Sequence, residues 1–128
     1  MDTSADYITM CTQASVLRKL WKPALGDYYY SRNSGEKCAM VLLVAKTFKV
    51  NKVWLPRLDQ LFALIEERYN VPGKPAYALN KFHQYLLAYS PRPGGSMEQL
   101  LLQFVMHELY NLHWSIKMWQ PYPPKITL

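Results

Sequence analysis

Hydrophobic positions recur along the chain at two spacings, and each spacing predicts a different kind of element. Alternating and aromatic positions between Tyr28 and Trp54 predict strands. Spacings of three and four residues predict helices at about 6–20, 56–69, 78–89 and 96–112. We therefore expect an α+β fold in which three to four helices pack on one face of a small antiparallel sheet of about three strands.

The first predicted helix has a clear beginning and a clear end. Thr3 or Ser4 can cap the exposed amides of its first turn. Pro23 disfavours helical backbone at the residue before it. We expect one continuous helix from about Asp6 to Leu20, and we expect it to stop near Trp21.

The middle of the chain predicts a β-hairpin followed by a third strand. Tyr28-Tyr29-Tyr30 suits a pleated surface, turn-forming residues follow at 32–36, and an apolar run extends from Cys38 to Ala45. The third strand is predicted over Phe48 to Trp54, where polar and apolar residues alternate.

Two positions for the turn before the third strand remain open. The chain can reverse at Lys46-Thr47, which leaves a full third strand. The second strand can instead run on and reverse at Asn51-Lys52, which leaves only a stub before the next helix. We prefer the first position.

A proline and two charged residues mark the second helix. Pro56 suits the first helical position, because its missing N–H group would have no partner there. Asp59 lies near the positive end of the helix dipole, and Arg68 lies near the negative end. The expected buried stripe consists of Leu58, Leu61, Phe62, Ile65 and Tyr69.

Two further helices are predicted before an irregular tail. Ala78 to Tyr89 has helical spacing, although its aromatic content also suits a strand, and we prefer the helix. Ser96 and Gln99 form a capping-box pattern at the start of the last helix. The tail at 115–128 contains Pro and Trp without a regular pattern and can be mobile. The last helix is expected to have a solvated row formed by Gln99, Gln103, His107 and Asn111.

Length and composition fit one domain, 1–128, with a single core. Of the 128 residues, 50% are hydrophobic and 19% are charged, unlike the composition of disordered proteins. The longest apolar run is too short to cross a bilayer, and no secretory signal precedes it. Cys11 and Cys38 form neither a metal-binding nor a redox pair. We expect a cytoplasmic protein with free thiols and no membrane partner.

Positive charge is concentrated in one stretch of the chain. The formal net charge is +6. Between Arg32 and Arg57 six basic residues stand against Glu36 alone. A local cluster of this kind focuses a positive potential, so the stretch favours an anionic partner.

Three segments carry a resemblance when they are taken together. They are Trp21-Lys22-Pro23 leading to Gly26-Asp27-Tyr28-Tyr29, then Trp54-Leu55-Pro56-Arg57-Leu58-Asp59-Gln60-Leu61, and then Ser96-Met97-Glu98-Gln99-Leu100 leading to Met106-His107-Glu108-Leu109-Tyr110. In this order they resemble small uncharacterised proteins encoded in phages and prophages of Gram-positive bacteria. The resemblance implies an origin, and it brings no catalytic residue, ligand or partner with it.

The resembling segments also have a structural interpretation. The string from Trp54 to Leu61 suits a strand-to-helix junction, in which every residue except Arg57 has a packing or capping role. The last helix of the similar proteins ends in Tyr-Gly-Lys, whereas this chain has Tyr110-Asn111-Leu112. Asn can replace Gly at a left-handed helix end, so we expect the cap to survive.

No residue pattern indicates catalysis or metal binding. His107-Glu108 could begin a zinc-protease helix, but Asn111 stands where the second histidine is required. His83 has no Ser, Cys or acidic residue at a spacing that connects to it. Cys11 lies in an apolar stripe and has the pattern of a small hydrophobic residue. We assign no catalytic residue, no metal and no cofactor, and we favour a protein that is not an enzyme.

One basic and aromatic patch has functional promise. Its basic side chains can neutralise phosphates while a ring stacks on a base, or the lysines can instead protect an edge strand from aggregation. We expect a phage or prophage accessory protein that binds another protein. The alternative is a small nucleic-acid-binding module that uses this patch, and the oligomeric state stays open. The patch consists of Lys46, Lys49, Lys52, Trp54 and Arg57.

Overall fold

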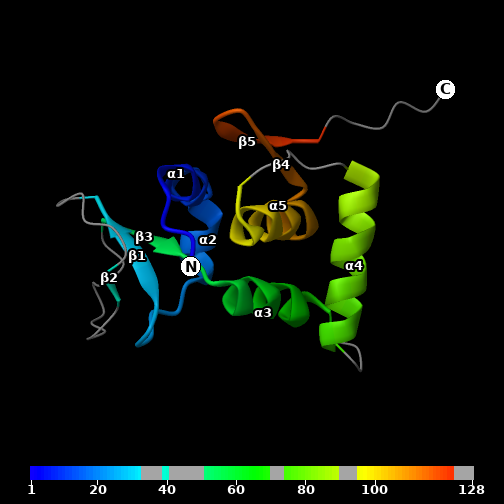
Figure 1. Ribbon diagram of the computed structural model, residues 1–128, viewed down its shortest axis with the longest axis horizontal. Helices are drawn as coiled ribbons and strands as arrows, with labels where there is room; N and C mark the ends of the chain where they lie inside the picture. The colour runs from blue at the N-terminus through cyan, green and yellow to red at the C-terminus, as the bar shows by residue number, and fades with distance from the viewer. Residues whose placement is uncertain (33–38, 41–50, 70–73, 90–94, 123–128) are drawn as a thin grey trace. The chain divides into compact units, whose positions relative to one another are not determined.

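The protein has an α+β fold, as predicted, and it divides into two compact units. The computed structural model describes residues 1–32, 39–40, 51–69, 74–89 and 95–122 (Figure 1). The units are Met1–Leu58 and Asp59–Leu128, and we describe each by itself. The single domain expected from length and composition remains a prediction.

An antiparallel sheet forms the β part of the first unit. Its strands are β1 (Tyr28–Ser31), β2 (Ala39–Met40) and β3 (Lys52–Leu55), in the spatial order β2-β1-β3. Tyr28 lies opposite Met40 on one side and opposite Leu55 on the other. The predicted hairpin and the three strands are therefore confirmed within the described residues.

The turn before β3 is described only in part. Asn51 adopts the left-handed conformation, with φ of 58°, and β3 begins at the next residue. The predicted strand residues Phe48 to Val50 and the preferred turn at Lys46-Thr47 lie outside the described residues.

Two short helices stand where one long helix was predicted. They are α1 (Ala5–Gln13) and α2 (Ser15–Leu20), and Ala14 between them has non-helical angles of φ −87° and ψ 62°. The residue type at Ala14 does not disfavour a helix, so the sequence does not predict this break. Both helices pack on β3 and Ala14 is buried, so tertiary packing overrides the local preference.

The predicted ends of this helical segment are confirmed. The Ser4 hydroxyl accepts a hydrogen bond from Tyr7 N at 3.2 Å and so caps α1. The second helix ends at Leu20, with extended backbone at Trp21, as expected two residues before Pro23.

The connection after β3 differs from the prediction at Pro56. The next helix, α3 (Leu58–Arg68), begins two residues later than expected, so Pro56 is not its first residue. The carbonyl oxygen of Pro56 instead accepts a hydrogen bond from the buried Tyr7 hydroxyl at 2.7 Å. This bond ties α1 to the end of β3.

The second unit contains most of α3, α4 (Lys74–Tyr89) and α5 (Met97–Tyr110). The helix predicted at 78–89 is confirmed, although it begins earlier, at Lys74. Ser96 caps α5 by accepting a hydrogen bond from Gln99 N at 3.1 Å, as its capping-box pattern predicts. No helix in the described ranges is long and apolar enough to cross a membrane.

The solvated row predicted on α5 is wrong in its middle. Gln103 is 5% exposed, and the six residues from Leu101 to Met106 are all buried. The sequence from Leu101 to Met106 is apolar on every side except at Gln103, which is the pattern of a helix that is buried all round.

A hairpin stands where the sequence predicted only an irregular tail. It consists of β4 (Leu112–Ser115) and β5 (Met118–Pro121), and Trp114 pairs with Trp119 across it. Asn111 ends α5 in the left-handed conformation, as expected, with φ of 55° and ψ of 42°. Ile116 has φ of 52° in the turn, a conformation that a β-branched residue rarely adopts. The residue type at this position therefore did not predict a turn.

A candidate basic pocket in the first unit

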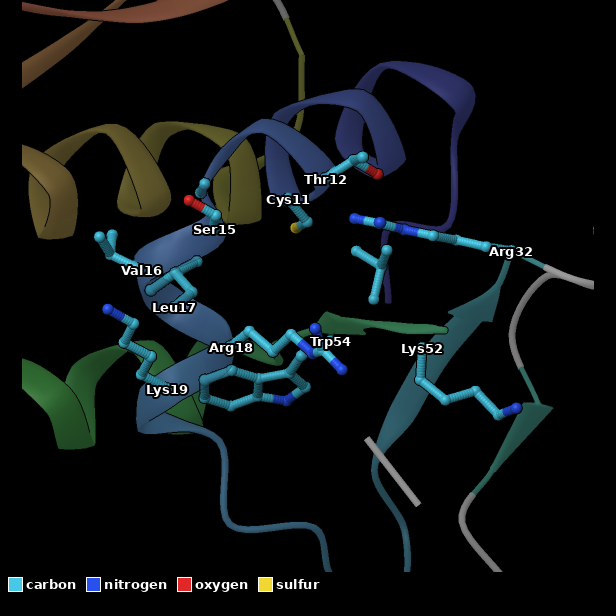
Figure 2. A pocket seen from close by; sticks show the side chains of 12 residues that line it. Cys11, Thr12, Ser15, Val16, Leu17, Arg18, Lys19, Arg32, Lys52 and Trp54 are labelled. Carbon is cyan, nitrogen blue, oxygen red and sulfur yellow. The ribbon is translucent and has the colours of Figure 1, made fainter. Parts of the chain in front are cut away.

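A pocket of about 510 Å³ lies in the first unit between the two short helices and the sheet (Figure 2). Its volume falls in the range of small-ligand sites. No Asp or Glu is among the residues that line it, all of which are described. The lining residues that carry chemistry are Arg18, Lys19, Arg32, Lys52 and Trp54.

Three elements place the basic side chains of the pocket. The last turn of α2 supplies Arg18 and Lys19, β1 leads directly into Arg32, and β3 begins with Lys52. The backbone N–H of Arg32 donates to the carbonyl oxygen of Asn51 at 2.9 Å. This bond holds the residue after β1 beside the residue before β3.

The two arginines reach into the pocket from opposite sides. In Figure 2 the side chain of Arg32 extends from the sheet towards Thr12 on α1, and that of Arg18 extends towards the Trp54 indole. Lys19 and Lys52 point away in opposite directions at the two ends of the view. Four cations around one pocket create a positive potential that favours an anion.

Trp54 forms an apolar wall of the pocket. Its side chain is buried, and its ring stacks on Trp21 with centroids 6.1 Å apart and planes 4° from parallel. One ring face is therefore covered, so Trp54 is a poor platform for a stacked base. Its Nε1 is buried and lacks a hydrogen-bond partner within the part of the chain that the structure describes.

The half-buried Tyr29 ring lies on the same sheet as Trp54. Tyr29 lies opposite Trp54, and residues directly opposite in an antiparallel pair share one face of the sheet. Lys52, two residues from Trp54 on β3, shares that face as well, and its Nζ lies 5.7 Å from the centroid of the Tyr29 ring. Lys52 and Tyr29 thus place a basic and an aromatic group side by side, but Tyr29 was not in the predicted patch and is not among the residues that line the pocket.

Arg57 belongs to a hydrogen-bond network with Gly26 and Asp27. Its Nη1 donates to the carbonyl oxygen of Gly26 at 2.7 Å and lies 3.4 Å from Oδ1 of the buried Asp27. The other carboxylate oxygen, Oδ2, accepts from Trp21 Nε1 at 2.9 Å and from Ala24 N at 3.0 Å. Asp27 therefore joins two of the segments that carry the resemblance and gives Arg57 a structural role.

The predicted patch is brought together only in part. Lys52 and Trp54 line the pocket, Arg57 belongs to the Asp27 network, and Lys46 and Lys49 lie outside the described residues. Arg18 and Lys19 were not predicted as site residues, because they are far from the basic stretch in sequence. Arg32 was predicted to lie in the basic stretch but not in the patch.

The cysteine in the pocket wall behaves as a small hydrophobic residue. Cys11 is buried, and burial raises the pKa of its thiol far above the usual range, so it is not an activated nucleophile. Cys38 lies outside the described residues. Within the described part of the chain, no group of three His, Cys, Asp or Glu side chains could hold a metal ion.

The histidines considered for chemistry lie in the second unit. His83 is exposed on α4. His107 packs among the rings of Tyr85, Tyr89 and Tyr122, with centroids 4.4–5.0 Å away. Burial lowers the pKa of His107, and the Glu108 carboxylate partly opposes this effect. This surrounding is a packed aromatic cluster and not a reactive centre.

The fold and the pocket define a small α+β protein with a basic site. Comparisons of the chain with models of protein families, with curated proteins and with solved structures find no match.

Proposed function

We propose that this chain is a non-enzymatic accessory protein of a phage or prophage that acts in the cytoplasm by binding single-stranded nucleic acid. The proposal rests on one observation: Arg18, Lys19, Arg32 and Lys52 surround one pocket that has no acidic lining residue. Among the two partners expected from the sequence, the pocket favours nucleic acid over protein.

A single-stranded polyanion suits this pocket for two reasons. Its phosphates are closely spaced along a flexible backbone, so several cations from different elements can each contact one. Its unpaired bases can stack on an aromatic ring, and Tyr29 lies beside Lys52 on the same sheet face. A duplex offers no such unstacked base.

The proposal predicts salt-dependent binding of an oligonucleotide. We expect a fluorescein-labelled oligothymidylate of about ten nucleotides to bind the full chain at low salt, measured by fluorescence anisotropy. If all four cations contact phosphates, the plot of log K against log salt concentration should have a slope of about −3. A duplex of the same length should bind more weakly.

A pair of double variants separates the pocket from net charge. Arg18→Gln with Arg32→Gln should weaken binding about tenfold or more and should halve the salt slope. Lys81→Gln with Lys117→Gln removes the same charge from the second unit and should leave both quantities nearly unchanged. Absence of binding at low salt, or equal losses in both double variants, would overturn the proposal. Binding of polyglutamate but not of the oligonucleotide would instead favour an acidic protein partner.

A further inference from the structure

The two arginines of the pocket are placed differently from its two lysines. Figure 2 shows the side chains of Arg18 and Arg32 on opposite sides of the pocket, whereas Lys19 and Lys52 point away in opposite directions. Both arginines are exposed, so an anion can reach them from solvent. The two guanidinium groups are therefore the cations best placed to meet one ligand group from two sides.

Two hydroxyl groups also line the pocket, and they come from Thr12 and Ser15. The Thr12 hydroxyl donates to the carbonyl oxygen of Ile8 at 2.7 Å, so its remaining capacity is that of an acceptor. Figure 2 shows Arg32 extending towards Thr12, and an acceptor there favours a guanidinium on that side of the pocket. Ser15 is exposed, so water can satisfy its hydroxyl group.

Guanidinium groups on two sides match a terminal phosphate better than an internal one. Each guanidinium presents its N–H donors in a planar fork that can bond two phosphate oxygens at once. A terminal phosphate has three unesterified oxygens and a charge of about −1.5 to −2 at pH 7. A phosphodiester within a strand has fewer unesterified oxygens and a single charge. The terminal group therefore satisfies more of the donors and more of the positive charge of two arginines.

The size of the pocket fits the end of a strand. Its volume of about 510 Å³ is that of a site for one small ligand, so it can take one nucleotide while the rest of the strand lies outside. Leu17, Val53 and Trp54 are buried residues of its lining and give it apolar walls. A sugar or a base can pack against such walls.

We propose that the pocket binds the terminal phosphate of single-stranded nucleic acid, with Arg18 and Arg32 clamping its oxygens from two sides. The proposal rests on the function proposed above and names the part of the strand that the pocket recognises. Lys19 and Lys52 attract the following phosphates and give no preference for an end. The recognised group is a phosphomonoester, which either the 5′ or the 3′ end of a strand can carry.

Competition between three unlabelled oligothymidylates of equal length tests this inference. One has hydroxyl groups at both ends, one has a 5′ phosphate and one has a 3′ phosphate, and each displaces the fluorescein-labelled strand from the full chain. We expect at least one phosphate-ended strand to bind about tenfold more tightly than the hydroxyl-ended strand, and the tighter of the two identifies the end. Equal affinities of all three strands would refute this inference while the proposed function stood. Absence of any binding would remove both.

Charge-conserving variants separate an arginine clamp from the added charge of the terminal phosphate. Arg18→Lys with Arg32→Lys keeps both positive charges but removes both forks, so the preference for a terminal phosphate should largely disappear. The hydroxyl-ended strand should bind this variant with an unchanged salt slope, which also shows that the variant is folded. Lys19→Arg with Lys52→Arg is the matched control and should keep the preference. A full preference in the Arg→Lys double variant would overturn the clamp.

Discussion

Asp27 in the first unit and His107 in the second both have buried polar atoms, and these atoms are satisfied in opposite ways. Asp27 in the first unit is 2% exposed and has hydrogen-bonded donors on both of its carboxylate oxygens. The ring of His107 in the second unit has a buried Nδ1 without a partner in the described residues. The first arrangement joins distant segments through hydrogen bonds, whereas the second depends on keeping a ring neutral among aromatic neighbours.

This difference determines how each unit can be disrupted. A satisfied buried carboxylate stabilises the fold through its partners, so removing it leaves several donors unpaired at once. Partial burial lowers the pKa of His107 and so favours its neutral form, and acid can therefore disturb the packing around it. The first unit should therefore respond most to mutation of its network, and the second should respond to pH.

The largest expected effect comes from Asp27→Ala. It leaves Trp21 Nε1, Ala24 N and the Arg57 guanidinium without their shared acceptor, which should lower the stability of the first unit by about 3 kcal/mol or more. Hydrogen exchange of the β1 and β3 amides measures this loss. Asp27→Asn keeps one acceptor oxygen and should lose clearly less. Unchanged protection of these amides in Asp27→Ala would contradict the role of the network.

The contacts of Asp27 also show which part of the structure could not be predicted from the sequence. The Trp54 to Leu61 segment was recognised as a strand-to-helix junction, and the sheet and α3 follow from local patterns. The purpose of Arg57 could not be predicted, because its partners at Gly26 and Asp27 lie about thirty residues earlier and no periodicity connects them. The basic pocket was missed in part for the same reason, since Arg18 reaches it from a different element.

The break at Ala14 and the turn at Ile116 have a related cause. Neither position carries a residue that favours its observed conformation, so local propensity predicts a continuous helix and no turn. Packing on β3 accounts for the break at Ala14, and the pairing of β4 with β5 accompanies the turn at Ile116. Elements defined by caps, such as α1 at Ser4 and α5 at Ser96, were predictable because a cap is a local interaction.

Removing one of those caps should have a smaller effect, and each unit contains one cap that can be removed by the same substitution. Ser4→Ala and Ser96→Ala each remove one acceptor for a backbone N–H at a helix start, so each should destabilise its helix by about 1 kcal/mol. Ser4→Asp and Ser96→Asp retain an acceptor and should restore most of the loss. Urea denaturation of the full chain, with exchange at α1 and α5 to locate the effect, measures both. A loss that the Asp variants do not restore would show that another interaction of the serine matters more.

The smallest effect at neutral pH belongs to His107, because its contribution changes only when the solution becomes acidic. Burial lowers the pKa of His107 in the folded chain, so its unfolded form, with a pKa of about 6.5, binds a proton more readily. The stability of the second unit should be fully present above about pH 6.5 and should fall as the pH drops through this value towards the folded pKa. Exchange of α5 amides at about pH 7.5 and about pH 5.5, corrected for intrinsic rates, measures the fall.

The variant His107→Phe tests whether this histidine is the origin of the pH response. A phenyl ring can pack against Tyr85, Tyr89 and Tyr122 without gaining a proton, so the loss of protection between these pH values should disappear. His83→Gln changes an exposed histidine on α4 and should keep the response of the unmodified chain. If His107→Phe retained the full response, the acid sensitivity would come from other groups, and the contrast between Asp27 and His107 would not extend to pH.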